Sequence, residues 1–215
     1  MNIFRFSGDM THLLSIVVLL LKIRATRSCR GISLKTQELY ALVFACRYLD
    51  LFYSYISLYN SVMKIIFLAT SFRIVHYMRY DKVVKQTYDK EQDTFRHVFL
   101  IVPCALLALI IHSSWSFTEL LWTFSIYLES VAILPQLVLM QRTQNIDNLT
   151  GNYVFLLGTY RGLYIINWIY RYFTETRYRQ WIVWTSGVLQ TALYADFFYY
   201  YFLCWKSNKK LQLPA

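Results

Sequence analysis

The sequence predicts an all-α membrane protein, folded as one domain with seven transmembrane helices. Two observations lead to this fold class. The chain is 57% hydrophobic and 19% aromatic, whereas a soluble domain is nearer about 45 to 50% apolar. Apolar stretches also recur at close to the roughly 20 residues that a membrane-spanning helix needs. With short connections, 215 residues hold seven such helices and leave no room for a sizeable soluble domain.

The predicted spans follow one another closely along the chain. The first has no basic leader and no small-residue cleavage site, so we expect a retained span rather than a signal peptide. The stretch Leu39 to Phe72 has no strong breaker, and we divide it at "SLYNS" because a single helix would be about 50 Å long. Pro135 is read as a bend within the fifth span. The seven spans are 2–22, 33–54, 58–79, 97–112, 117–140, 152–173 and 180–204.

Basic residues set the predicted orientation. The segments 22–35, 79–96, 141–151 and 205–215 share one side of the membrane and hold 14 of the 22 Lys and Arg residues. The positive-inside rule makes that side cytosolic, so the N-terminus faces the lumen and the tail 205–215 the cytosol. The net charge of +10 is then explained without a nucleic-acid partner. The sequon at Asn148 is expected to stay unused on the cytosolic side.

No pattern in the sequence indicates an enzyme, a metal site or a cofactor. The four cysteines are scattered without a CxxC, and the four histidines lack HxxxH or HExxH spacing. No nucleophile and base can be paired with an orienting third group. We therefore expect neither catalysis nor a bound metal or cofactor.

Polar residues inside four of the spans recur at helical spacing. Charges inside a bilayer are costly and usually face a bundle interior, so we expect these stripes to surround one wet cavity. The alternative is that Asp50 merely neutralises Arg47 and that the aromatic residues form an interfacial belt. The stripes are Arg5, Gly8, Asp9 and His12; Arg47, Asp50, Leu51 and Ser54; Glu119, Trp122, Glu129 and Gln136; and Tyr160, Tyr164, Asn167, Trp168 and Arg171.

The charges on these stripes indicate the class of ligand. The arginine side chains match carboxylates or phosphates bidentately, and Glu119 near the lumenal end can receive a cation. A ligand with several carboxylates and one amine fits, as does a short acidic peptide or a phosphorylated metabolite. His12, with an ordinary pKa of about 6.5, is the natural sensor of an acidic compartment; the alternative is a buried neutral histidine. Protonated beside Glu129, it would release an arginine that the glutamate holds.

Two short matches indicate an internal repeat. "FACRYLDLF" around Arg47 and "GTYRGLYII" around Arg161 both place Arg-x-Leu in the middle of a span. We expect two parallel three-helix repeats, about 1–80 and 117–204, joined by the connector helix 97–112. The pair Pro135-Gln136 resembles the signature of PQ-loop and SWEET-type transporters.

Longer motifs lie in order from end to end of the chain: "MNIFRFSGDM", "RYLDLF", "WTFSIYLESVAILPQL", "YRGLYIINWIYRYF" and "LYADFFYYY". They resemble the ER lumen protein-retaining receptors, also called KDEL receptors, and are nearest in wording to plant members. The resemblance implies a SWEET-like receptor in the endoplasmic reticulum and Golgi membranes that binds C-terminal Lys-Asp-Glu-Leu or His-Asp-Glu-Leu (KDEL or HDEL) peptides. It would capture escaped proteins in the acidic Golgi and return them.

The resemblance also implies individual roles. Arg47 and Tyr48 would take the terminal carboxylate of the peptide, Arg5 its glutamate and Arg171 its aspartate, while Glu119 and Trp122 would receive the first Lys or His. Further pocket residues would be Ser54, Arg161, Tyr164, Asn167 and Trp168, and the pH-sensing group His12, Glu129 and Tyr160. Retrograde sorting, through the coatomer coat, would involve Asp196, Lys206, Lys209 and Lys210.

One departure and one alternative remain. The stretch "TETRYRQW" at 174–181 is more polar than the animal pattern of the family and one residue longer. This loop would alter preference at ligand positions beyond the tetrapeptide. The alternative function, from a different class, is a SWEET-like transporter of a small anionic solute, because the fold and the Pro-Gln motif are shared.

Overall fold

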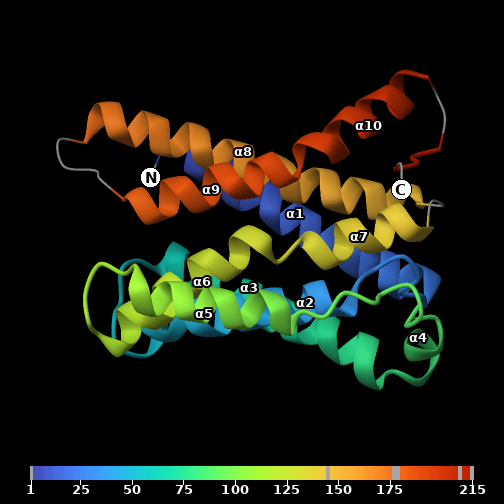
Figure 1. Ribbon diagram of the computed structural model, residues 1–215, viewed down its shortest axis with the longest axis horizontal. Coiled ribbons are helices and arrows are strands. Elements are labelled where there is room, and N and C mark those ends of the chain that lie inside the picture. Colours follow the sequence, from blue (N-terminus) through green and yellow to red (C-terminus); the bar gives the residue numbers. More distant parts are fainter. Residues whose placement is uncertain (1, 144–145, 176–179, 208–209, 214–215) are drawn as a thin grey trace.

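A computed structural model describes residues 2–143, 146–175, 180–207 and 210–213, and all regular secondary structure within these ranges is helical. The long helices lie side by side along the longest axis of the molecule (Figure 1). The N-terminus lies at one end of this bundle, and the short helix α4 and the C-terminal tail lie at the other. The all-α prediction is therefore confirmed for the described part of the chain.

The helices follow in two runs separated by the loop between α5 and α6. The first run comprises α1 (Ile3–Thr26), α2 (Leu34–Arg47), the 3-10 helix η1 (Tyr48–Phe52), α3 (Leu58–Tyr80), α4 (Lys82–Gln86) and α5 (Val98–Ile110). The second comprises α6 (Phe117–Val131), α7 (Leu134–Thr143), α8 (Asn148–Thr174), α9 (Trp181–Leu193) and α10 (Ala195–Lys206).

Side-chain caps fix where several helices begin. The Ser57 hydroxyl accepts a hydrogen bond from the Asn60 amide at the start of α3, as serine commonly does at this position. The division at "SLYNS" is thus confirmed. Asn2 caps α1 and Asp147 caps α8 in the same way.

Two predicted spans are not single α-helices. The span predicted over 33–54 leaves the α conformation at Arg47 and continues as the tighter η1. Asp50 therefore does not follow Arg47 on an α-helical stripe, and its carboxylate pairs with Lys64 of α3, 2.5 Å away. The span predicted over 180–204 is broken at Tyr194, which is fully buried and whose amide bonds to the Thr191 carbonyl. The expected bend near Pro135 is present, as the interruption between α6 and α7.

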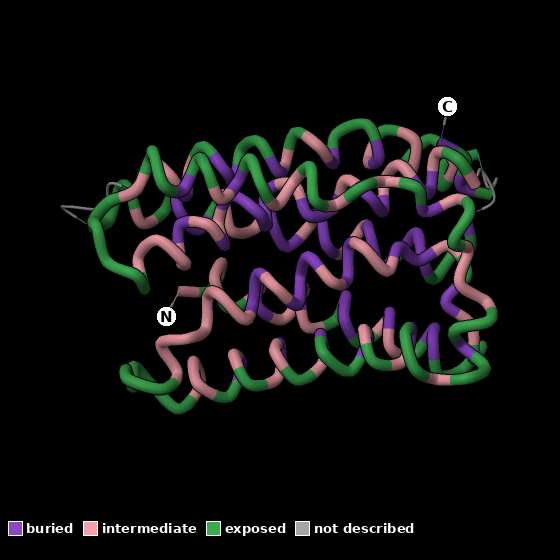
Figure 2. The backbone as a smooth tube through the Cα atoms, turned by 60° about the horizontal axis from the view of Figure 1, so that its bottom comes forward, coloured by how far each residue is buried: buried purple, intermediate pink, exposed green. Residues whose placement is uncertain are grey.

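The buried core lies where the helices face one another, and the outer faces are exposed (Figure 2). α1 packs along α8, and α9 packs against both α6 and α8. One contact requires glycine: a Cβ at Gly187 of α9 would lie 2.2 Å from the Trp168 ring of α8. This close approach brings α8 and α9 together beside the cavity described below.

Among the described residues, three helical segments are long and apolar enough to cross a membrane: Ile3–Thr26, Leu58–Tyr80 and the combined α6 and α7 segment, Phe117–Thr143. α5 is shorter but strongly apolar, and it exposes large hydrophobic side chains such as Phe99, Leu106 and Ile110. α8 spans 27 residues, and its buried polar residues, including Arg161 and Asn167, lower its hydropathy. The seven-span topology with two parallel repeats stays a prediction.

Candidate functional site

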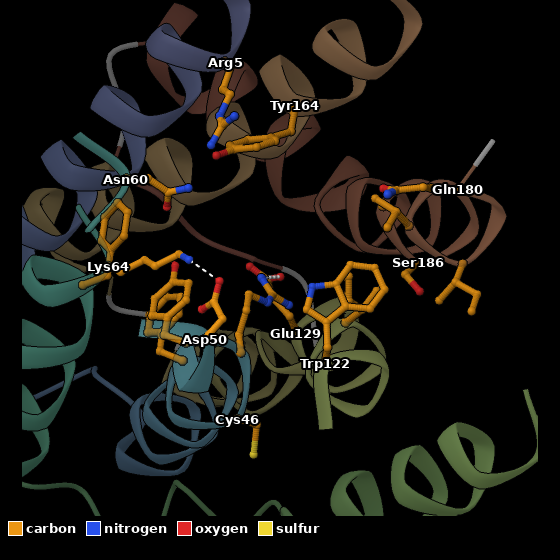
Figure 3. A pocket seen from close by; sticks show the side chains of 18 of the residues that line it. Arg5, Cys46, Asp50, Asn60, Lys64, Trp122, Glu129, Tyr164, Gln180 and Ser186 are labelled. Atoms are coloured by element: carbon orange, nitrogen blue, oxygen red, sulfur yellow. Dashed lines mark hydrogen bonds and ion pairs between the residues drawn. The ribbon is translucent and has the colours of Figure 1, made fainter. Parts of the chain in front are cut away.

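A cavity of about 920 Å³ lies between α1, the end of α2, η1, α3, α6, α8 and α9 (Figure 3). It extends from loop residues at the N-terminal end of the bundle, such as Ser113 and Gln180, to Glu129 near the middle of the chain's fifth predicted span. Ser54 is exposed and is not among the lining residues. The other predicted pocket and pH-sensing residues all line it: Arg5, His12, Arg47, Tyr48, Glu119, Trp122, Glu129, Tyr160, Arg161, Tyr164, Asn167, Trp168 and Arg171.

One buried carboxylate organises the floor of this cavity. Glu129 is 3% exposed, and its Oε2 lies 2.5 Å from Arg47 Nη1 and 2.5 Å from Arg161 Nη2. Its Oε1 accepts a hydrogen bond of 3.0 Å from the Tyr160 hydroxyl. Arg47 also donates to Ser125, at the side-chain hydroxyl and the backbone carbonyl. The alternative in which Asp50 neutralises Arg47 is therefore wrong.

The floor carries an excess of positive charge. Two guanidinium groups, of Arg47 and Arg161, share the single negative charge of Glu129. In a poorly solvated site an uncompensated charge is costly. A carboxylate or phosphate that entered the cavity would restore the balance, so the floor is suited to bind an anion.

His12 lies against the floor through an aromatic contact. Its ring stacks on Tyr160, with centroids 4.2 Å apart and an interplanar angle of 12°, and on Phe67 on another side, at 4.6 Å. Tyr160 in turn donates to Glu129. The histidine is thus coupled to the Glu129 carboxylate through Tyr160, in a buried position.

Two further carboxylates on the cavity wall are paired across helices. Asp9 accepts hydrogen bonds from the hydroxyls of Tyr59 and Tyr164, and Asp50 pairs with Lys64. Sequence reasoning gave Tyr59 no role and gave Lys64 only an unclear one. Their partners lie on other helices, so no spacing along the chain reveals the pairs.

The mouth of the cavity combines charges with aromatic walls. Glu119 is half-buried in the first turn of α6, and Trp122 lies one turn deeper. Arg171 donates two hydrogen bonds of 2.8 Å to Glu175 near the end of α8. These bonds hold the pKa of the Glu175 carboxyl below its ordinary value. Arg5 also lines the wall of the cavity. The loop 174–181, which differs from the animal pattern of the family, falls partly outside the described residues, at 176–179.

The predicted sorting residues lie away from the cavity. Asp196 is exposed at the start of α10. Lys206, at the end of α10, and Lys210, in the tail, are also exposed, while Lys209 lies outside the described residues. The tail folds back toward the body of the molecule (Figure 1). Leu211 and Leu213 are 8% and 4% exposed and join the main hydrophobic core.

An ion pair joins α1 to the N-cap of α8 at the end of the bundle opposite the cavity mouth, and its Asp147 side is half-exposed. Lys22 is 3% exposed and lies 2.5 Å from the Asp147 carboxylate. It also donates to the Thr150 hydroxyl. Partial burial raises the pKa of the Asp147 carboxyl, but the hydrogen bond and charge of Lys22 outweigh this and leave that pKa below its ordinary value. Within the described ranges, no group of three or more His, Cys, Asp or Glu side chains could hold a metal ion.

Comparisons with known proteins give one consistent result. Residues 28–171 match the family described as ER lumen protein retaining receptor. The whole chain aligns with the whole of ER lumen protein-retaining receptor B of Arabidopsis thaliana at 70% identity, and with the receptor of Petunia hybrida at 66%. ER lumen protein-retaining receptor 2 of Homo sapiens is 54% identical, again over both full lengths. The chain therefore belongs to the ER lumen protein-retaining receptor family.

Proposed function

We propose that this protein is a pH-dependent receptor for the C-terminal Lys/His-Asp-Glu-Leu signal of soluble proteins that have escaped the endoplasmic reticulum. It binds them in the Golgi and returns them by retrograde vesicle traffic. The observation that carries the proposal is the cavity floor, where one buried carboxylate is shared by two arginines. The names of the relatives support a retention receptor rather than a transporter of small solutes.

The ligand would enter with its C-terminus first. Its terminal carboxylate would reach Arg47 and Tyr48 at the floor, where negative charge is in deficit. The amine or imidazole of its first residue would stay near Glu119 and Trp122, close to the mouth. Arg5 and Arg171 would meet the glutamate and aspartate between these ends. The cavity volume of about 920 Å³ lies at the upper end of the range for ligand sites, about 300 to 1,000 Å³.

Arg161 and three later residues of α8 would complete this pocket. Tyr164, Asn167 and Trp168 lie on the same helix as Arg161 and line the same wall. Ser54 would act at the outer edge of the pocket. These five assignments are part of the proposal.

The pH dependence would arise at the floor. At neutral pH Glu129 holds Arg47, which is then less able to bind the ligand's carboxylate. In an acidic compartment His12 would gain a proton, and its positive charge would attract Glu129 through the intervening Tyr160. Arg47 would be released toward the ligand. Binding would therefore be stronger in acid and weaker at neutral pH.

The sorting step would take place on the other side of the membrane. We place the N-terminus in the lumen and the C-terminus in the cytosol, with seven spans between them, because most basic residues fall in the segments on one side. Asp196 and the tail lysines Lys206, Lys209 and Lys210 would then support recognition by the coatomer coat.

Peptide binding by the purified receptor tests the proposal. A His-Asp-Glu-Leu peptide is compared with its C-terminally amidated form, about one pH unit below and one above the ordinary histidine pKa of about 6.5. We expect tight binding of the free acid only in acid. Equal binding of the amide, or equal binding at both pH values, would remove the receptor proposal. Uptake of peptide into sealed vesicles would instead favour transport.

A further inference from the structure

A second pocket, of about 400 Å³, lies where the loop after α4 meets the first turns of α2 and α5. It shares no lining residue with the cavity described above. Its walls combine two cationic side chains and a histidine with two large apolar side chains, and none of the five is acidic. These residues are Lys35, Arg96, His97, Val98 and Phe99.

The two cations of this pocket form no ion pair within the described ranges. The ammonium of Lys35 donates to the backbone carbonyl of Asp93, which carries no net charge. The carboxylate of Asp93 accepts hydrogen bonds from the hydroxyls of Ser33 and Tyr88. Arg96 is exposed. The pocket therefore offers positive charge that an anion can bind.

The loop that carries Arg96 is fixed to the start of α2. Asp93 is 2% exposed, and its carboxylate lies 3.0 Å from the Ser33 hydroxyl and 2.7 Å from the Tyr88 hydroxyl. Ser33 is also the N-cap of α2. Arg96 follows this anchor by three residues, so its position is set before any ligand arrives. A preformed site loses less conformational entropy when it binds.

An exposed apolar face begins at the pocket and continues along α5. Residues 98–111 include no charged residue, and α5 packs against α6. Its buried residues, Cys104 and Ala108, lie on one side of the helix. At about 100° per residue, the opposite side carries large exposed apolar side chains at spacings of three or four residues. They are Phe99, Val102, Leu106 and Ile110.

A cationic pocket at the start of an exposed apolar helix fits an amphiphile. Phosphate oxygens accept hydrogen bonds from guanidinium and ammonium groups, and acyl chains pack on apolar side chains. Basic pockets between membrane helices on the cytoplasmic side bind anionic headgroups in this way. The positive-inside rule accounts for basic residues beside an apolar helix, but not for their grouping around a pocket.

We propose that this pocket binds the headgroup of an anionic phospholipid. Arg96 and Lys35 hold the phosphate, and the acyl chains lie along Phe99 and Val102 of α5. In the orientation proposed above, this lipid belongs to the cytosolic leaflet, where anionic lipids are concentrated. The pocket and the peptide cavity share no residue, so the proposal stands whether or not the cavity binds a retention peptide.

Photolabelling of the unmodified receptor tests the site. The full chain is embedded in phosphatidylcholine bilayers with a trace of phosphatidylserine that carries a diazirine in its acyl chain, just below the headgroup. The matched control probe has the same chain on a phosphatidylcholine headgroup. Mass spectrometry then gives, for each residue, the ratio of labelling by the serine probe to labelling by the choline probe.

This ratio should be about fivefold higher at Val98 and Phe99 than at Phe72, as expected for one favourable cation near the headgroup. Phe72 is an exposed aromatic side chain of α3 beside the exposed Arg73, so it reports the general attraction of basic residues for anionic lipid. Equal ratios at the three positions would overturn the proposal. Because this test needs no variant, a failure to fold cannot leave the question open.

A pair of charge variants tests the role of Arg96. Arg96→Gln and Lys90→Gln each remove one exposed positive charge from the same loop, but Lys90 does not line the pocket. Arg96→Gln should lower labelling of Val98 and Phe99 by the serine probe about fivefold, and Lys90→Gln should leave it unchanged. Equal losses would show diffuse attraction and overturn the site. An unchanged pattern with the choline probe verifies that each variant is folded.

Competition with a soluble headgroup distinguishes a lipid from a free anion. Glycerophosphoserine has the phosphate and the serine of the probe but no acyl chain. In excess, it should leave the labelling of Val98 and Phe99 unchanged, because it makes no contact with α5. Displacement of the probe would assign the pocket to a soluble phosphate compound and overturn the lipid proposal.

Discussion

Replacing Glu129 by glutamine tests the central ion cluster most directly. The change keeps the size of the side chain and one carbonyl acceptor but removes the negative charge shared by Arg47 and Arg161. Removing one partner of a buried ion pair typically costs about 3 to 5 kcal/mol, because the remaining charge is left uncompensated. The lower value is appropriate here, since Arg47 keeps both of its hydrogen bonds to Ser125. The unliganded variant should therefore lose about 3 kcal/mol of stability.

The same substitution should change how the ligand stabilises the receptor. A peptide carboxylate would replace the missing charge, so the peptide should raise the melting temperature of Glu129→Gln at neutral pH nearly as much as in acid. In the unmodified receptor the increase should be confined to acid. Thermal unfolding with and without a His-Asp-Glu-Leu peptide at both pH values measures this difference.

A matched control distinguishes the effect of losing a buried charge at the cavity floor from the effect of losing a charge at the cavity mouth. Glu175→Gln removes a carboxylate of the same type, which binds Arg171 at the exposed end of α8, and it should leave the pH dependence unchanged. The reasoning about the floor is refuted if Glu129→Gln retains the full difference between acidic and neutral pH.

Three further outcomes are expected. His12→Ala should abolish most of the pH dependence of peptide binding, measured by titration calorimetry; a variant with full pH dependence would remove His12 as the sensor. Gly187→Ala places a methyl group 2.2 Å from the Trp168 ring, so it should lower stability by about 1 to 3 kcal/mol and weaken peptide binding; unchanged melting and affinity would contradict the close packing of α8 on α9. Asn148 should carry no glycan when the receptor is made in eukaryotic cells, because its sequon is placed on the cytosolic side; a glycosidase-sensitive shift in mass would reverse the proposed orientation.

Local signals in the sequence were sufficient for much of the fold. Helix length required a division near "SLYNS", and Ser57 caps the helix that begins there. The end of α2 at Arg47 could not be predicted in this way, because neither proline nor glycine marks it. The η1 turn that follows pairs Asp50 with Lys64 of α3, a contact that local sequence does not reveal. The break at Tyr194 could not be predicted either, since neither proline nor glycine marks it. At the break the Tyr194 ring is buried close to Gly158 of α8, a contact between helices that local sequence does not reveal.

The candidate site, too, could be predicted only in part from local signals in the sequence. Charges within apolar spans indicated which residues face the interior, and Arg47, Glu129 and Arg161 do meet in the structure. The expectation that Glu129 holds an arginine is confirmed, but helical spacing alone did not exclude Asp50, which is the nearer neighbour of Arg47 in sequence. The pairs of Asp9 with Tyr59 and Tyr164 were missed because helical spacing does not reveal partners on other helices.

The docked tail has a practical consequence for experiments that use fusion proteins. Leu211 and Leu213 pack into the core, and Leu211 lies beside Gly151 near the start of α8. A fluorescent protein joined to this tail would pull on these two leucines and compete with their packing. The loop at Lys90 and Glu91 is exposed at the same end of the molecule and is a better insertion point, since exposed loop tips tolerate added domains. A fusion protein labelled there should keep the tail in its native position.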